Sequence, residues 1–293
     1  MVTIRVPATT ANLGPGFDCL GAALTLYARF SFEQAEGLTI TGCEPEFADK
    51  NNLVYQAFIH ALTVFGLPKS GLSLHIRSDI PPARGLGSSA ACIAGGILGA
   101  AKLFGVPLSK EELFNLTARM EGHPDNAAAA VYGGLRAAII QEGKAHSLPL
   151  TLHPSLRFLA LVPDFSLSTH KARGVLPETV TREDAVFNLS RTAFLVRALE
   201  TGEPEAIRLA CMDRLHQPYR FPLIPGAEAL ARAAMDLGAT ACFISGAGPT
   251  LMCMYRDEDF PINIGTILKS GFSRFRALPL APCPEGVIVE SMD

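Results

Sequence analysis

One stretch of the chain decides its fold: residues 81–91, which read Pro81-Pro82-Ala83-Arg84-Gly85-Leu86-Gly87-Ser88-Ser89-Ala90-Ala91. The prolines prevent regular hydrogen bonding just upstream, and the glycines allow backbone angles and close approaches that a Cβ would block. Ser88 and Ser89 then fall where a helix begins, so their hydroxyls converge with the unpaired N–H groups of its first turn. The helix dipole adds about half a positive charge there, and the stretch therefore predicts a phosphate site.

Three interpretations of this stretch compete. A Walker A loop requires Gly-Lys-Ser/Thr, which occurs nowhere in the chain. Gly85, Gly87 and Ala90 match the dinucleotide pattern, but a proline-containing loop replaces the strand that should end at the first glycine. The acids at the right distance, Glu111 and Glu112, fall in an expected helix, which weakens that interpretation further. The third interpretation is a glycine turn that only starts a core helix.

A second concentration of polar chemistry follows two helices later. Residues 88–104 predict a helix that is apolar nearly all round and therefore buried. A capping box at Ser109-Lys110-Glu111-Glu112 begins the next helix, which leads to Glu121-Gly122-His123-Pro124-Asp125-Asn126. These carboxylates, imidazole and amide are costly to bury without ligands or partners. The alternative is a solvated connection in which Asp125 or Asn126 caps the following helix.

The N-terminal segment offers a further candidate. Residues 2–6 predict a short strand, and residues 7–21 read as a loop rich in glycine and proline. Within this loop Asn12 and Asp18 can present an amide and a carboxylate to a ligand. They can equally satisfy local backbone groups, and the spacing alone does not decide between these roles.

Composition limits the partners. The 293 residues are 48% hydrophobic and 18% charged, with a formal net charge of -3, so no basic surface for nucleic acid or an anionic membrane is expected. No run of ~18 uncharged apolar residues predicts a membrane span, and the opening residues lack the apolar segment of a signal peptide. Seven cysteines without Cys-x-x-Cys spacing read as reduced core residues. We therefore expect a cytoplasmic protein with a small-molecule partner.

The pattern restarts after residue 150, which predicts two domains, 1–150 and 151–293. The second half contains an apolar strand at 156–162, a basic segment ending at Arg173, and another lone cation at Arg220. Lone arginines are usually surface charges, so their interest depends on what faces them. The alternation of strands and helices indicates a split βαβ layer. Its expected elements are helices at 181–199, 205–212, 226–237 and 264–268, and strands at 241–244, 251–255, 275–280 and 287–290.

Four separated motifs, in order, resemble those of the GHMP small-molecule kinases. Residues 81–91 resemble the family's Pro-x-x-x-Gly-Leu-Gly-Ser-Ser-Ala-Ala signature, and Ser245-Gly246-Ala247-Gly248-Pro249-Thr250 resembles its third motif. Residues 7–18 and His123-Pro124-Asp125-Asn126 resemble one branch of the family, which phosphorylates the side-chain hydroxyl of L-homoserine on the way to threonine. A proline expected soon after the Asp-Asn pair is replaced within Ala127–Ala130, which concerns helix geometry more than chemistry.

The resemblance implies an α+β fold with an N-terminal domain like ribosomal protein S5 domain 2 and a ferredoxin-like C-terminal domain. It implies ATP and Mg²⁺ as cofactors, with Ser89 and Glu121 as metal ligands and Glu121, Asp125 and Asn126 as catalytic groups. A general base is left open in this branch, so Asp125 and Asn126 are expected to orient the substrate. The residues expected to bind ATP are Pro82, Ala83, Arg84, Gly85, Leu86, Gly87, Ser88, Ser89, Ala90 and Ala91. Those expected to bind the amino acid are Asn12, Asp18, His123, Asp125, Thr169, Arg173 and Arg220.

Elementary chemistry agrees with the residues expected to bind the amino acid, because an α-amino acid requires a carboxylate for its ammonium and a guanidinium for its carboxylate. Other functions stay open at this stage. A dinucleotide-dependent oxidoreductase would bind NAD or NADP, and a non-catalytic module would bind ATP without phosphorylating an alcohol. Another small alcohol such as mevalonate is the alternative within the family, but it lacks an ammonium. Whether the protein forms a homodimer is also open.

Overall fold

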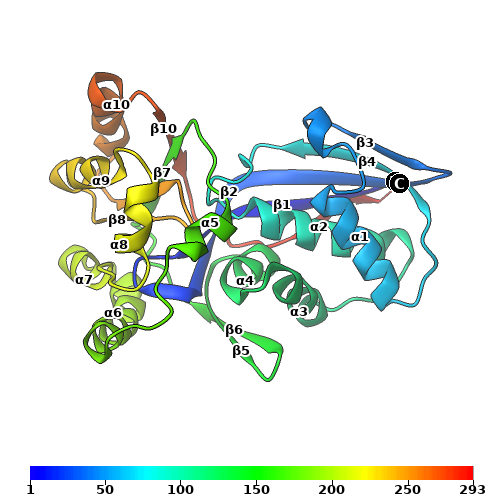
Figure 1. The fold of residues 1–293 in the computed structure, drawn as a ribbon, viewed down its shortest axis with the longest axis horizontal. Coiled ribbons are helices and arrows are strands. Elements are labelled where there is room, and N and C mark those ends of the chain that lie inside the picture. The colour runs from blue at the N-terminus through cyan, green and yellow to red at the C-terminus, as the bar shows by residue number, and fades with distance from the viewer. Residues whose placement is uncertain (293) are drawn as a thin grey trace.

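The computed structural model describes residues 1–292 and contains two β-sheets, each covered by helices (Figure 1). The first sheet has seven strands, and most of it runs in the order β11-β1-β2-β4-β3, with β5 pairing to β2 and β6 to β5. Only the β3–β4 pairing is parallel. The strands of the first sheet are β1 (Val2–Asn12), β2 (Gly16–Ala35), β3 (Leu38–Thr41), β4 (Gly71–Ser78), β5 (Leu135–Gln141), β6 (Lys144–Leu150) and β11 (Ile288–Met292).

Helices α1 (Leu53–Val64), α2 (Ser88–Leu103), α3 (Lys110–Glu121) and α4 (Pro124–Tyr132) accompany this sheet, with a 3₁₀ turn at Pro45–Phe47. α2 and α4 pack on β1 and β2, while α1 lies against α2 and α3 against both α2 and α4. Because neighbours surround α2, its sequence can be apolar on nearly every side. The predicted capping box is confirmed at Ser109 and Glu112, where both reciprocal hydrogen bonds form.

The second sheet is antiparallel and runs in the order β10-β7-β9-β8. Its chain order, strand, helices, two strands, helix and strand, is the ferredoxin-like arrangement that the sequence predicted. The strands are β7 (Arg157–Pro163), β8 (Ala241–Ile244), β9 (Leu251–Tyr255) and β10 (Phe275–Leu280). The helices of this half are α5 (Thr169–Gly174), α6 (Arg182–Thr201), α7 (Pro204–Ala210), α8 (Gln217–Arg220), α9 (Ala227–Asp236) and α10 (Phe260–Gly271), with a 3₁₀ turn at Phe221–Leu223.

The sequence of β7 is continuously apolar because both faces of this strand are buried. Phe158, Ala160 and Val162 belong to the hydrophobic core that also fills the first half of the chain. Leu159 and Leu161, on the opposite face, pack into a second core with residues of α9 and α10. The first of these two cores is therefore shared by both sheets.

Two expectations were wrong. Most of the expected loop at residues 7–21 is the hairpin of β1 and β2, whose turn is confined to residues 13–15. The strands tolerate Pro7 because the pairing register of β1 with β2 shifts between Pro7 and Ala8.

The last strand also differs from expectation. It was expected to complete the second layer, but β11 pairs with β1 in the first sheet. The division at residue 150 stays a prediction, although the chain after it does not all belong to the second sheet. None of the helices within residues 1–292 combines the length and apolar character that crossing a membrane requires.

Candidate active site

A cavity of about 770 Å³ opens where the two halves meet. We call residues 81–91 the glycine loop and residues 245–250 the second glycine turn; both contribute to its wall. Three expected ATP-binding residues do not line the cavity: Leu86 and Ala90 are buried in the core, and the Arg84 guanidinium donates to backbone carbonyls of Pro82, Pro163 and Asp164. The expected site residues that do line it are Asn12, Asp18, Pro82, Ala83, Gly85, Gly87, Ser88, Ser89, Ala91, Glu121, His123, Asp125, Asn126, Thr169, Arg173 and Arg220.

The glycine loop delivers the first turn of α2 to this cavity. Gly87 is the N-cap in the left-handed region, with φ of 68°, and it offers no side chain to the N–H groups of that turn. At Gly85 a Cβ would collide with the carbonyl oxygens of Ser245 and Gly248, so glycine lets the loop lie directly on the second glycine turn. The Ser245 hydroxyl fastens this contact by donating to the Gly85 carbonyl oxygen at 2.6 Å. Backbone donors thus face the cavity at a rigid helix start.

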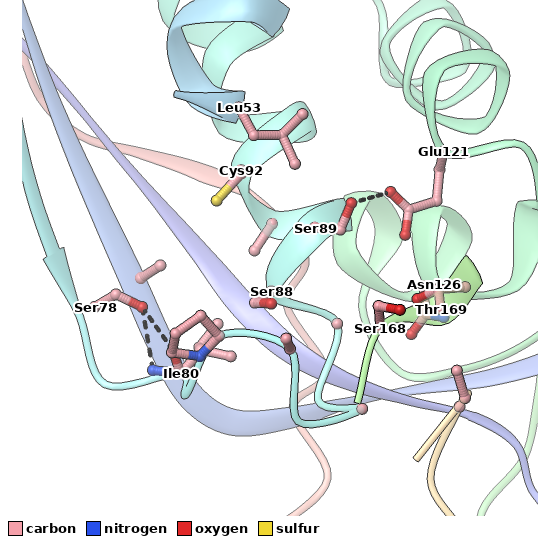
Figure 2. A pocket seen from close by; sticks show the side chains of 18 of the residues that line it. Leu53, Ser78, Ile80, Ser88, Ser89, Cys92, Glu121, Asn126, Ser168 and Thr169 are labelled. Atoms are coloured by element: carbon pink, nitrogen blue, oxygen red, sulfur yellow. Dashed lines mark hydrogen bonds between the residues drawn. The ribbon is translucent and has the colours of Figure 1, made fainter. Parts of the chain in front are cut away.

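Ser89 and Glu121 bring two oxygen ligands to the same place. The Ser89 hydroxyl donates to Oε2 of Glu121 over 2.6 Å, as Figure 2 shows. The Glu121 side chain is only 9% exposed. Burial raises the pKa of this carboxyl, and the hydrogen bond from Ser89 offsets part of that effect. The charges of His123, whose Nε2 lies 3.8 Å from Oε1 of Glu121, and of Arg173 offset a further part, and the pKa stays raised overall, so a cation beside this carboxylate would be favourable.

On α4, Asp125 and Asn126 are buried, with 2% and 8% of their surface exposed. Oδ1 of Asp125 accepts from the Asn126 backbone N–H at 2.7 Å and contacts Nδ1 of His123 at 2.9 Å. Oδ1 of Asn126 accepts from the Thr9 hydroxyl at 2.6 Å. His123 is the N-cap of α4, so neither Asp125 nor Asn126 serves as that cap. Together these bonds fix both side chains at the cavity wall.

Burial alone lowers the pKa of His123, but the hydrogen bond and charge of Asp125, with the charge of Glu121, raise it overall. The protonated ring therefore contributes to the free energy of unfolding, and this contribution is fully present below about pH 6.5. It is lost as pH rises through the pKa of His123 in the folded protein. We expect the unfolding temperature of His123→Gln to fall below wild type by more at about pH 5.5 than at about pH 8.5. Thermal unfolding without ligands checks this, with the exposed His60→Gln as control. A deficit of equal size at both pH values would contradict it.

Asp18 and Arg173 form an ion pair across the two halves of the chain. The guanidinium donates from Nη2 to Oδ1 at 2.6 Å and from Nη1 to Oδ2 at 3.0 Å. This hydrogen bond and the charge of Asp18 raise the pKa of Arg173, although burial opposes the effect. The guanidinium carbon of Arg173 lies 5.6 Å from the centre of the Phe17 ring. The cavity thus holds one carboxylate and one guanidinium already matched to each other.

The burial of Arg220 and the hydrogen bonds of Asn12 could not be read from the sequence alone. Arg220 is 1% exposed rather than a surface charge, and its pKa is lowered to about 10, first by burial and then by the positive charge of Arg173. The Asn12 amide is used by the backbone: Nδ2 donates to the Gly246 carbonyl at 2.7 Å, and Oδ1 accepts from the Asp18 N–H at 3.0 Å. Asn12 therefore holds the tip of the hairpin to the second glycine turn while lining the cavity.

Sequence reasoning missed several residues that build the site, among them Thr9, Phe17 and His216. Thr9 lies beside Asn126, and the Phe17 ring lies within 5.6 Å of both arginine guanidinium carbons. His216 precedes Arg220 by four residues, the spacing at which helical side chains meet, and this signal was available.

Thr169, which the sequence did predict, is the first residue of α5. It is exposed and directly follows the N-cap Ser168.

Family models and relatives agree on what this fold is. The family model described as GHMP kinases N terminal domain matches residues 52–134, and the one described as GHMP kinases C terminal matches residues 195–273. Homoserine kinase from Clostridium botulinum is 43% identical over 294 residues, covering 99% of both chains. The chain belongs to the GHMP kinase family. Homoserine kinase from Clostridium beijerinckii is 44% identical over 261 residues, or 88% of each chain.

Solved structures support the fold of this GHMP kinase. A homoserine kinase from Cytophaga hutchinsonii superposes with a TM-score of 0.85 at 26% identity, covering 98% of this chain and 96% of that one. Mevalonate kinase from L. major, solved with R-mevalonate, gives a TM-score of 0.72 at 18% identity over 95% of each chain. At that identity the second likeness concerns the fold alone. The two-domain fold inferred from the four motifs is confirmed.

Proposed function

We propose that this GHMP kinase transfers the γ-phosphoryl group of ATP to the side-chain hydroxyl of L-homoserine, producing O-phospho-L-homoserine. The observation that carries the proposal is the Asp18–Arg173 ion pair, which lies in the same cavity as the open first turn of α2. An α-amino acid carries both complementary charges, so its ammonium can face Asp18 while its carboxylate faces Arg173. Curated homoserine kinases that match nearly the whole chain support this substrate.

The cavity divides into an apolar and a polar side around the start of α2. Figure 2 shows Leu53, Ile80 and Cys92 on one side of that turn, with Ser78 as a polar neighbour, and Glu121, Asn126 and Thr169 on the other. The apolar side suits a nucleotide base, and the backbone N–H groups between the sides suit its phosphates. This arrangement would direct the terminal phosphate toward Asp125, Asn126 and the two arginines.

Glu121 and Ser89 would hold Mg²⁺ beside those phosphates. Carboxylate and hydroxyl oxygens are ligands that this ion accepts, with water and phosphate oxygens completing its coordination. Among residues 1–292 no three His, Cys, Asp or Glu side chains gather in a way that would hold a metal ion, so we propose one carboxylate and one hydroxyl as the protein ligands. When bound, the ion neutralises phosphate charge during transfer.

The residues of the polar side act by orientation. Asp125 and Asn126 are fixed by His123 and Thr9, so they can hold the substrate hydroxyl in line with the terminal phosphate. Phosphoryl transfer through a loose transition state depends mainly on positioning and charge neutralisation. We therefore assign neither residue as an obligatory general base.

A panel of acceptors tests the function directly. We expect Mg-ATP to be converted to ADP rapidly with L-homoserine, slowly with L-serine and L-threonine, and not measurably with mevalonate. Mass spectrometry of the product should place the phosphate on the side-chain oxygen. Faster ADP release with mevalonate than with homoserine would refute the proposal, and so would heat protection by NAD without any by Mg-ATP.

Arg173→Met tests the carboxylate contact. Methionine keeps the apolar stem and removes the fork, so we expect KM for homoserine to rise about ten- to a hundredfold while KM for ATP stays nearly unchanged. Steady-state kinetics with each substrate varied in turn measures both constants. Arg274→Met is the matched control, because Arg274 makes a similar forked contact with Asp164 but does not line the cavity. A rise in KM for ATP alone would instead place Arg173 at the phosphates.

A further inference from the structure

We infer that His216 is a positioning residue that fixes the Arg220 guanidinium for the carboxylate of the substrate. This inference rests on the proposed function, because it takes an amino acid as the acceptor. It concerns a histidine outside the segments that resemble the family's motifs, and His216 does not itself line the cavity. Its imidazole acts on Arg220 from behind.

The tautomer of His216 follows from its two ring contacts. The ring is fully buried, and Nε2 lies 2.8 Å from the carbonyl oxygen of Gly14. A carbonyl oxygen can only accept, so Nε2 carries the proton. Nδ1 of the neutral ring is then an acceptor, and Nη1 of Arg220 donates to it over 3.2 Å. Burial lowers the pKa of His216, which keeps the ring in this neutral form.

Residues of several elements hold Arg220, and each contact restricts the rotation of its guanidinium group. Nε donates to the Ala172 carbonyl at 3.2 Å, and Nη1 donates to the Gly246 carbonyl at 3.1 Å as well as to His216. Within residues 1–292, Nη2 has no hydrogen-bond partner, and Arg220 lines the cavity. The remaining donor edge is therefore available to a carboxylate.

His216 is itself held by a stacked ring and by a backbone hydrogen bond, in addition to its two ring-nitrogen contacts. Its ring stacks on Phe17 with a centroid separation of 5.2 Å and an interplanar angle of 22°, and the guanidinium carbon of Arg220 lies 5.2 Å from the same Phe17 ring. The fully buried carboxylate of Asp213 accepts from the backbone N–H of His216 at 3.0 Å and of Gln217 at 2.7 Å. The imidazole thus ties Arg220 to the turn between β1 and β2, near the ion pair of Asp18.

Two variants separate the two ring contacts. In His216→Asn the amide oxygen can replace Nδ1 as the acceptor for Arg220, but it cannot reach Gly14. In His216→Gln the amide nitrogen can replace Nε2 as the donor to Gly14, but the acceptor for Arg220 is lost. We expect His216→Gln to raise KM for homoserine about fivefold to tenfold, and His216→Asn to raise it less than about twofold. KM for ATP should stay at the wild-type value in both.

A merely structural role predicts a different result: both variants would lower the unfolding temperature while KM for homoserine stayed unchanged, and that outcome overturns the inference. Arg220→Met distinguishes this failure from failure of the proposed function. If Arg220→Met raises KM for homoserine but His216→Gln does not, only the role of His216 is wrong. If Arg220→Met leaves KM for homoserine unchanged while homoserine is still phosphorylated, the contact of Arg220 with the carboxylate is wrong and the proposed function stands. In the double variant, His216→Gln should add no further rise to that of Arg220→Met.

A measurement on the wild-type protein covers the case in which the variants do not fold. In protein labelled with ¹⁵N at histidine, the long-range ¹H–¹⁵N spectrum distinguishes the two neutral tautomers and the charged ring. We expect one histidine that stays neutral, with the proton on Nε2 and an unprotonated Nδ1, throughout the neutral pH range. A proton on Nδ1 of His216 would rule out a hydrogen bond accepted from Arg220 and would overturn the inference.

Discussion

Gly87→Val is expected to lower kcat/KM by roughly a hundredfold or more, because it displaces the start of α2 from the geometry that the phosphates require. Gly87 has a φ of +68°, which β-branched residues rarely adopt. A Cβ on it would also fall on the Thr9 hydroxyl, well inside van der Waals contact. That hydroxyl donates to Asn126, so the variant disturbs the glycine loop and the orienting amide together. Nucleotide affinity, measured by calorimetry, should fall in parallel.

Gly105→Val separates backbone strain from collision. Gly105 follows the other end of α2 and has a φ of +66°, and among residues 1–292 no atom beyond its two chain neighbours lies within 4 Å of where a Cβ would lie. This control should lose stability through strain and keep its nucleotide affinity. If folded Gly87→Val bound ATP as tightly as wild type, the assignment of the glycine loop would be wrong.

Glu121→Ala is expected to reduce kcat by roughly a hundredfold and to leave KM for homoserine nearly unchanged, because it removes the only carboxylate among the proposed Mg²⁺ ligands. The Mg²⁺ concentration that gives half of the maximal rate should rise, as a magnesium titration of the rate would measure. Glu111→Ala is the control, since Glu111 lies on the same helix but is exposed and pairs with Lys144. Turnover near wild type with an unaltered magnesium dependence would mean that Glu121 is only structural.

Stability provides an independent view of the same carboxylate. Because the pKa of Glu121 is raised in the folded protein, ionisation costs folding free energy as pH rises through its titration. Without metal, the unfolding temperature of Glu121→Ala relative to that of wild type should therefore rise as pH increases from about 4.5 to neutral. A loss of activity without a loss of stability would identify the position as one kept for function.

Local sequence patterns were sufficient for much of the fold. The helix after the glycine loop, the capping box at Ser109 and the strands of the second sheet depend on periodicity and turn chemistry, which neighbouring residues carry. The partner of β11 could not be read in this way, because pairing of Val2 with Met292 joins opposite ends of the chain. The β1–β2 hairpin was hidden because its glycines and prolines are typical of loops.

The sequence predicted which residues belong to the site better than it predicted the contacts among them. Motif resemblance named Asp18, Arg173 and Arg220, but neither the ion pair between the first two nor the burial of the third follows from sequence. Both depend on how the hairpin and the second glycine turn meet, which is a tertiary property. Asn12 illustrates the limit: its spacing allowed either a ligand or a backbone role, and the structure shows its amide occupied by backbone groups.

The alternating side chains of β7 also bear on what counts as a folding unit in this chain. Two domains that merely touch can separate at the cost of an interface. Here Phe158, Ala160 and Val162 lie in one hydrophobic cluster with the first half, while Leu159 and Leu161 anchor the helices behind them. Cutting the chain between the segments matched by the two family models would open that cluster to water on both fragments. We therefore expect the segments matched by the two models to unfold together, in a single thermal transition, rather than one after the other.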